Sequence, residues 1–178
     1  MHMNRAFARH IKRTLKRRSQ HDLCRSGHFC DNSRVAFRPS RKFMPQFETW
    51  QDVARFDRLA GVAVSTEQVQ IKQLHPFQRD IDQRVVTHLL NKWREQGIQP
   101  SLAQEMPIMV DQNNTILDGH HRWATLKVLI SNGDLPARFK LAVRKYAAPA
   151  EKLIFIAMNN GFNSGYTYST APKKNVYV

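Results

Sequence analysis

Apolar residues recur at helical spacing in five segments of the chain, 4–18, 48–59, 81–96, 120–131 and 149–158. The third segment gives the clearest pattern, because Asp80 stands at an N-cap position and Gly97 at a stop position. Its apolar stripe repeats every four residues and consists of Ile81, Val85, Leu89 and Trp93. Pro149 stands at a favourable first position of the last segment. The pattern therefore predicts five helices.

Shorter apolar or alternating segments predict strands between these helices. Val69–Leu74 alternates as VQIKQL, and residues 139–143 alternate as FKLAV. Pro107–Val110 and Thr115–Leu117 are apolar runs separated by the polar turn Asp111–Asn114, which favours a hairpin. This order of helices and strands predicts an α+β fold, with a small mixed sheet surrounded by helices.

The length and apolar content of the chain bound its domain organisation. A chain of 178 residues with 42% apolar residues is long enough for one globular domain. We place this domain at residues 46–165, after a basic arm at 1–45 and before a polar, basic tail at 166–178. Three tryptophans lie on or beside apolar stripes and are expected in the core: Trp50, Trp93 and Trp123. No apolar run approaches the roughly 18 residues of a membrane-spanning helix.

Charge is concentrated in the N-terminal arm. The chain has 28 Lys and Arg against 14 Asp and Glu, a net charge of +14, and twelve of these basic residues but only two of the acidic ones lie within residues 1–42. A cationic segment binds polyanions by releasing their counterions, so the arm predicts a nucleic acid partner, DNA in particular. A solvated tail is the alternative. The basic helix predicted at residues 4–18 is compatible with binding to DNA, to an anionic membrane surface or to a partner protein.

The two cysteines, Cys24 and Cys30, both lie in the arm and are typical of a reduced, cytoplasmic protein. We expect a bacterial cytoplasmic location, with the inner-membrane surface as a further location reached through the basic arm. With His21 and His28, the cysteines offer four zinc ligands within ten residues. Their spacing matches no common zinc finger, and a basic linker without metal is the alternative.

The sequence Asp118-Gly119-His120-His121-Arg122 joins a predicted strand to a predicted helix. The first turn of a helix presents unpaired backbone N–H groups and partial positive charge, which favour a phosphate. Gly119 permits a close approach of the backbone, and the two imidazoles and the guanidinium can donate to the same oxyanion. Asp118 is a candidate ligand of a divalent ion that bridges phosphates. A capping role for Asp118, with both histidines on the surface, is the alternative.

Two sequence blocks carry a resemblance to a known family. The run PIMVDQNNTILDGHHRWATLKVL resembles the core of the ParB/sulfiredoxin superfamily, and the upstream VQIKQLHPFQRDID resembles its first conserved block. Together they cover about residues 67 to 160. The resemblance implies a ParB/sulfiredoxin-like fold that binds ATP or another nucleoside phosphate, with Mg²⁺.

The branches of this superfamily imply different activities. Sulfiredoxins have a cysteine where His120 stands, so reduction of a sulfinic acid is excluded. Chromosome-partitioning ParB proteins carry a Gly-Glu-Arg-Arg turn and a further helix-turn-helix domain. Free serine kinases share the Asp-Gly-His-His-Arg turn but place an acidic residue where Pro76 stands. Small plasmid-borne, Osa-like fertility-inhibition proteins remain, and they imply ATPase and DNase activities directed at DNA transfer by a conjugation or secretion system.

Further residues are candidates for contacts with the nucleotide. Arg79 and Arg84 flank the start of the predicted helix 81–96 and would reach phosphates if that helix lies against the turn; solvated charges are the alternative. Asn160 follows the last helix and is a candidate for a contact with base or ribose, although Asn-Gly sequences also end helices.

The sequence thus predicts an enzyme that binds a nucleotide at Gly119, His120, His121 and Arg122. Arg122 would stabilise developing negative charge, one of the histidines would carry the proton, and Asp118 would hold the metal. A non-catalytic switch that binds ATP or CTP and docks on DNA or protein is the first alternative. A small-molecule kinase is the second.

Overall fold

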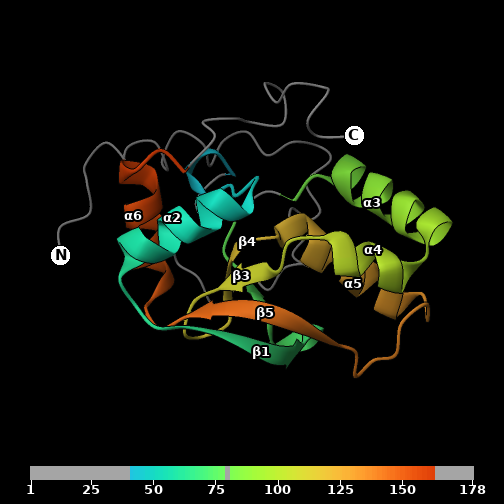
Figure 1. The fold of residues 1–178 in the computed structure, drawn as a ribbon. Coiled ribbons are helices and arrows are strands. Elements are labelled where there is room, and N and C mark those ends of the chain that lie inside the picture. Colours follow the sequence, from blue (N-terminus) through green and yellow to red (C-terminus); the bar gives the residue numbers. More distant parts are fainter. Residues whose placement is uncertain (1–40, 79–80, 163–178) are drawn as a thin grey trace, which may run out of the picture.

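The computed structural model describes residues 41–78 and 81–162, and in this part a five-stranded sheet lies between two layers of helices (Figure 1). The strands are β1 (Val64–Gln70), β2 (His75–Pro76), β3 (Ile108–Val110), β4 (Thr115–Asp118) and β5 (Lys140–Tyr146). Their order in the sheet is β1-β5-β3-β4-β2. β1 with β5 and β3 with β4 are antiparallel, whereas β3 with β5 and β2 with β4 are parallel. The prediction of an α+β fold with a mixed sheet is confirmed.

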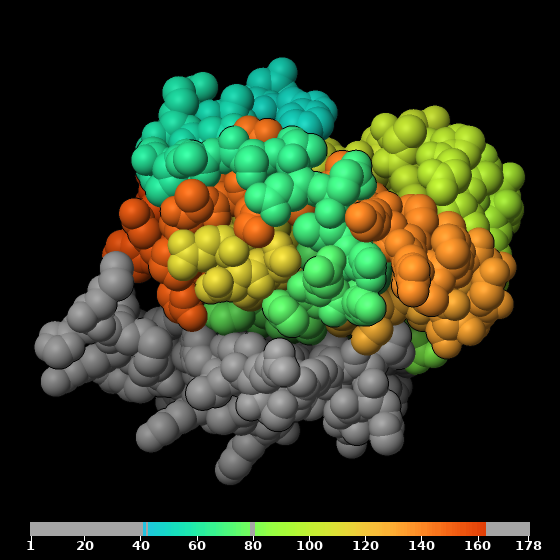
Figure 2. Space-filling model, turned by 90° about the horizontal axis from the view of Figure 1, so that it is seen from below, coloured from blue at the N-terminus to red at the C-terminus, as the bar shows by residue number. Residues whose placement is uncertain are grey.

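Helices cover both faces of the sheet. One layer contains α2 (Trp50–Ala60) and α6 (Ala150–Asn159). The other contains α3 (Gln83–Gln96), α4 (Ile98–Gln104) and α5 (His120–Ser131). Two short 3-10 helices, η1 (Arg41–Phe43) and η2 (Ile71–Gln73), complete the described chain. In Figure 2, α2 and α6 form one end of the molecule and α3, in yellow-green, lies at the other.

The alternation of side chains along the central strands divides the core in two. Ile108 and Val110 of β3 are buried against the layer with α3 and α5, whereas Met109 between them is buried against α2 and α6. Successive strand residues point to opposite faces of a sheet, so an all-apolar strand fits only a sheet that is covered on both sides. The short apolar runs of this chain are therefore central strands.

Several sequence predictions are confirmed closely. α5 spans the predicted residues 120–131, and β3 and β4 form the predicted hairpin. α2 ends at Gly61, which has the left-handed φ of 60° that favours glycine after a helix. Trp93 and Trp123 are buried as expected. These elements carry strong periodicity with clear start and stop signals.

The predicted strand Val69–Leu74 is wrong in its bounds. β1 begins at Val64 and ends at Gln70, and the next three residues form η2. β1 lies at an edge of the sheet and pairs with β5 over its whole length; most of its residues are polar, and Val69 is its one buried residue. An exposed edge strand has no apolar run, and its pattern therefore gave no signal.

Trp50 is not a core residue, because it lies in the first turn of α2 and is 58% exposed. The helix buries Val53, Phe56 and Ala60 instead. The N-cap of α3 is Asp82 and not Asp80: the Asp82 side chain accepts a hydrogen bond from the Arg84 amide at 2.9 Å. The last predicted helix also differs slightly, with Pro149 as the N-cap of α6 and not as its first residue.

Sequence reasoning missed α4 altogether. The helix follows Gly97 directly and holds Pro100 in its first turn, where a missing N–H breaks no intrahelical bond. The packed region also begins earlier than residue 46, because Met44 is fully buried and the Gln46 amide donates to the Phe162 carbonyl at 2.7 Å. Among residues 41–78 and 81–162, no helix has the length and apolar content needed to cross a membrane.

Candidate phosphate-binding site

A single glycine, Gly119, connects β4 to α5. Gly119 is the N-cap of α5 and has a left-handed φ of 101°. A Cβ atom at this position would lie 3.0 Å from the Arg122 guanidinium and 3.0 Å from the Ile108 side chain. No side chain caps the helix, and its first turn contains no acidic residue. The turn therefore has the open, positive end that the sequence predicts.

A cavity of about 100 Å³ lies at this first turn of α5, and we call it the turn cavity. It is lined by Arg41, Gln46, Gln78, Asp118, Gly119, His120, His121 and Arg122. The structure thus brings all five residues of the predicted turn to one space. Its other lining residues come from the segment before α2 and from the segment between β2 and α3.

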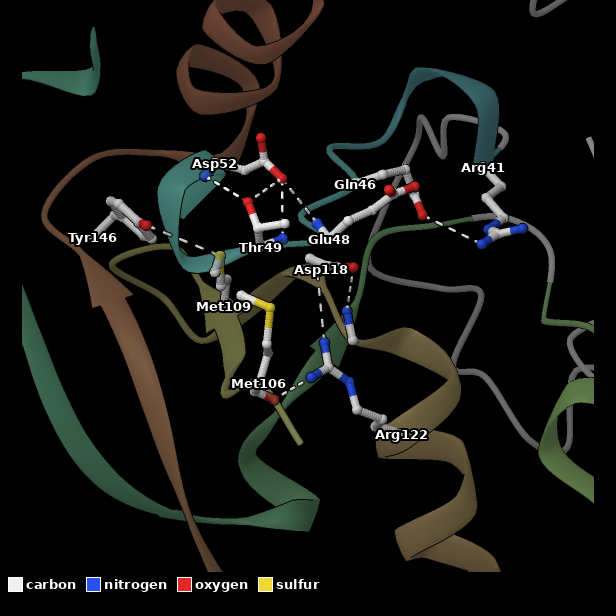
Figure 3. A network of polar contacts seen from close by, with 11 residues as sticks. Arg41, Gln46, Glu48, Thr49, Asp52, Met106, Met109, Asp118, Arg122 and Tyr146 are labelled. Carbon is white, nitrogen blue, oxygen red and sulfur yellow. Dashed lines mark hydrogen bonds and ion pairs between the residues drawn. The ribbon is translucent and has the colours of Figure 1, made fainter. Parts of the chain in front are cut away.

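Two arginines supply positive charge to the turn cavity. Arg122 is 14% exposed, donates to the Met106 carbonyl, and lies 3.5 Å from the Asp118 carboxylate (Figure 3). Arg41 donates to the Gln46 side chain at 3.3 Å. The Asp118 carboxylate accepts a hydrogen bond from the Gly119 amide at 2.9 Å. Two guanidinium groups against one carboxylate make the part of the lining that the structure describes positive.

Both histidines of the turn accept hydrogen bonds from backbone amides. His120 is 2% exposed, and its Nε2 accepts from the Phe77 amide at 3.0 Å and from the Gln78 amide at 2.9 Å. His121 Nε2 accepts from the Asp82 amide at 3.1 Å. An imidazole nitrogen accepts only when it carries no proton, so these contacts require Nε2 to be unprotonated in both rings.

Burial governs the protonation of the turn. Burial, together with the smaller effects of the charges on Arg41 and Arg122, lowers the pKa of His121 to about 3. His121 is therefore neutral at physiological pH. Burial also raises the pKa of Asp118, against the opposing effects of Arg122, of the Gly119 amide, of Arg41 and of the Phe47 amide.

The other predicted site residues do not line the turn cavity. Arg84 lies in the first turn of α3, is 50% exposed, and binds the Asp82 carboxylate through two nitrogen atoms, the shorter contact being 2.6 Å. Asn160 follows α6, and its side chain donates to the Ile156 carbonyl at 2.8 Å. Arg79 lies outside the described residues, as does the predicted zinc cluster of His21, Cys24, His28 and Cys30.

Sequence reasoning missed three residues of the cavity. Arg41 and Gln46 stand at the border of the basic arm, where an arginine has many equivalent neighbours in the sequence. Gln78 belongs to the HPFQRD block, of which only Arg79 is predicted from the sequence to contact the nucleotide. One feature of the sequence could have indicated Gln78: the HPFQRD block directly precedes α3, and α3 packs against α5 beside the turn.

Asp118 is the one carboxylate among the described residues that line the turn cavity. Within the described segments, no group of three or more His, Cys, Asp and Glu side chains is placed to hold a metal ion. Mg²⁺ is commonly held by one or two carboxylates together with the phosphates of a nucleotide. The residues present therefore fit a magnesium ion only as part of a nucleotide complex, with Asp118 as the protein ligand.

Comparison with known proteins gives limited similarity. No protein-family model matches the chain, and no curated protein matches it. Two solved structures are similar to it, one of a pNOB8-like ParB N-domain and one of the C2221 form of such a domain. The first is 18% identical with a TM-score of 0.33, the second 21% identical with a TM-score of 0.32, and each covers 60% of this chain.

The chain spans only 38% and 41% of the lengths of these two structures. At this level of similarity, the resemblance to the ParB/sulfiredoxin superfamily continues to rest on the sequence of the turn and of its flanking strand and helix.

Proposed function

We propose that this protein binds a nucleotide, with one phosphate group in the turn cavity. The observation that carries the proposal is the position of this cavity at the start of α5, between the guanidinium groups of Arg41 and Arg122. A helix start without a side-chain cap favours an anion, and guanidinium groups bind phosphate oxygens through charge-assisted hydrogen bonds.

The size of the cavity indicates which part of the ligand it takes. Pockets for whole small molecules measure roughly 300–1,000 Å³. The turn cavity, at about 100 Å³, suits a single phosphate group rather than a base and a ribose. We propose ATP or another nucleoside triphosphate as the ligand, with Mg²⁺ held by Asp118 and the phosphates. The base and sugar would then lie outside the cavity.

Titration of the full chain with ATP, ADP and CTP, each with and without Mg²⁺, tests the proposal. Arg41→Gln should weaken nucleotide binding by about tenfold or more, because it removes a charge-assisted hydrogen bond to phosphate. Arg58→Gln is the matched control, since it removes the same charge from an exposed position on α2. Absence of binding by the unchanged protein, or equal affinity of both variants, would contradict the proposal.

Hydrolysis of the bound nucleotide is a second candidate, and Asp118 favours it. A carboxyl group whose pKa is raised by burial, beside an arginine in a polar cavity, has the character of a general base. In this role Asp118 would not hold Mg²⁺, which the phosphates alone would bind. Asp118 would accept the proton of an attacking water, and Arg122 would stabilise the charge that develops on the phosphate. The histidines suit this role less, because backbone amides already occupy both Nε2 atoms.

Asp118→Asn tests this second candidate. Asparagine keeps an oxygen that can accept the Gly119 amide but cannot take up a proton at neutral pH. We expect phosphate release from ATP to fall by about a hundredfold while nucleotide binding changes by less than about tenfold. Unchanged phosphate release would exclude Asp118 as the base. No phosphate release from the unchanged protein would favour the non-catalytic switch, and phosphate transfer to free serine would favour the kinase.

We propose DNA as the macromolecular partner, because positive charge is concentrated in residues 1–42. Cleavage of this DNA and inhibition of its transfer by a secretion system follow only from the resemblance to the Osa-like branch. Incubation of the protein with plasmid DNA, with ATP and Mg²⁺ present or omitted, tests cleavage directly. Intact DNA under both conditions would leave binding as the role of the arm.

A further inference from the structure

We infer that His120 and His121 are positioning residues, whose Nε2 atoms hold the main chain of Phe77–Gln78 and of Asp82 against the first turn of α5 and so shape the wall of the turn cavity. The inference rests on the proposed function, because it concerns the same cavity. It assigns the two histidines a task other than contact with the phosphate.

The geometry of His120 carries the first step. Two successive backbone amides, those of Phe77 and Gln78, converge on one ring nitrogen at 3.0 and 2.9 Å. His120, Phe77 and Gln78 are all almost fully buried, with 2%, 5% and 2% exposure. A buried amide needs an acceptor, and the imidazole supplies one for both. The contact therefore fixes the direction of the main chain at Gln78, which lines the cavity.

His121 makes the equivalent contact on the other side of this segment. Its Nε2 accepts from the Asp82 amide at 3.1 Å, and Asp82 is the N-cap of α3. The Asp82 carboxylate is fully engaged as well, because it accepts from the backbone and the side chain of Arg84. Through His121 the start of α3 is thus tied to the start of α5.

The two histidines and the two arginines consequently have different roles in the site. Neutral imidazoles set the position of the wall, and the guanidinium groups of Arg41 and Arg122 provide the charge. This division explains why adjacent histidines are compatible with a helix start: neither has to carry a positive charge there. Ligand affinity should therefore depend on the ability of Nε2 in His120 and His121 to accept a hydrogen bond, and not on the basicity of these side chains.

Substitutions that keep or remove this acceptor test the inference. Glutamine can place its side-chain oxygen close to the position of Nε2 and accept an amide, whereas leucine fills similar space without an acceptor. With ATP and Mg²⁺ as the probe and the full chain in a calorimeter, His120→Leu and His121→Leu should each bind at least about tenfold more weakly. His120→Gln and His121→Gln should stay within about threefold of the unchanged protein.

His75→Leu is the control, because this histidine is exposed on β2 and should tolerate the change. Glutamine variants as weak as the leucine variants would overturn the inference, since they would show that the imidazole itself contacts the ligand. Leucine variants with unchanged affinity would overturn it too, because the hold on the main chain would then be irrelevant to binding.

A measurement on the unchanged, ligand-free protein keeps the inference testable even where a leucine variant does not fold. Nitrogen-15 NMR of the imidazoles should show protonated Nδ1 and unprotonated Nε2 for both histidines, with slow hydrogen exchange at the amides of Phe77, Gln78 and Asp82. The opposite tautomer in either ring would overturn the inference. The expected tautomers without any binding of ATP would instead refute the proposed function and leave the contacts to the main chain standing.

Discussion

Replacement of Gly119 by any other residue has two unfavourable effects, backbone strain and steric overlap. Its φ of 101° is one that side chains disfavour, and an added Cβ would lie 3.0 Å from both Arg122 and Ile108. Arg122 cannot easily retreat, because its guanidinium also binds the Met106 carbonyl and faces Asp118. Gly119→Ala should therefore lower the free energy of unfolding by about 2–4 kcal/mol, as measured by urea denaturation.

Gly133→Ala separates the effect of backbone strain from that of steric overlap. Gly133 also has a left-handed φ, of 80°, but an added Cβ there meets no atom within 4 Å. Its substitution should cost only the backbone strain, about 1 kcal/mol. Equal losses for the two variants would show that the close approach of Arg122 to Gly119 contributes nothing.

His121 makes the stability of the protein depend on pH. Its pKa is about 3 in the folded protein and 6.5 in the unfolded chain, so between these values only the unfolded chain binds the proton. The free energy of unfolding should therefore fall as the pH is lowered from about 6.5, with a slope of up to roughly 1.4 kcal/mol per pH unit. Above that range this contribution is constant. Urea denaturation at several pH values measures it.

The His121→Gln variant isolates this contribution. Asp118 acts in the opposite sense, because its raised pKa lets the folded protein keep a proton that the unfolded chain has lost. Subtracting the curve of the variant from that of the unchanged protein removes the effect of Asp118. Parallel curves between about pH 4 and about pH 6.5 would show that His121 is not buried in its neutral form.

At the level of whole elements, one carboxylate joins the β3–β4 hairpin to α6. Asp111 is 3% exposed, and its Oδ1 accepts from the amides of Asn113 and Thr115 at 2.8 and 2.7 Å. Its Oδ2 accepts from the amide of Ala150, the first residue of α6, at 3.1 Å. The aspartate thus shapes the turn and satisfies a helix start that Pro149 cannot cap.

Asp111→Ala should therefore destabilise the protein by about 2–4 kcal/mol, because three backbone amides lose their acceptor, one of them the buried amide of Ala150. Asp111→Asn should cost less, since one oxygen remains to accept the two amides of the turn. Asp134→Ala is the control: its ion pair with Arg94 is exposed, and such pairs contribute at most about 1 kcal/mol. A loss for Asp111→Ala no larger than that of the control would refute this role.

Secondary-structure elements with strong local signals could be predicted from the sequence. α5 and the β3–β4 hairpin were predictable because buried residues, turn residues and stop signals agree locally. β1 and α4 were not, because an edge strand is polar and a short helix with Pro100 lacks a regular stripe. The DGHHR turn was predictable from composition. The direction of its histidines was not, since it depends on amides that lie about forty residues away in the sequence.

For the molecule as a whole, the turn cavity depends on segments that are distant in sequence. Arg41 and Gln46 precede α2, Gln78 precedes α3, and the remaining lining residues lie at the end of β4 and the start of α5. Met44 and Phe47 anchor the first of these segments in the core with α2 and α6. A domain boundary at residue 46 would therefore pass through the site, because Arg41, which belongs to residues 1–45, lines the turn cavity.

The distribution of charge over the whole molecule leads to a prediction about DNA. Glutamine substitutions of Lys12, Arg13, Lys16, Arg17 and Arg18 remove five positive charges from the arm. If these residues neutralise phosphates, the slope of log K against log salt concentration for duplex DNA should become shallower by about 4.5. Fluorescence anisotropy of a labelled duplex over a range of salt concentrations measures this slope.

A matched variant tests whether position or merely net charge matters. Five exposed basic residues of the domain provide the same change in charge: Arg58, Lys72, Arg138, Lys140 and Lys152. Their replacement by glutamine should leave the slope nearly unchanged, because counterion release depends on the residues that contact phosphates and not on overall charge. Equal changes in the two variants would mean that DNA binds without preference for the arm, and residues 1–45 would lose their proposed role.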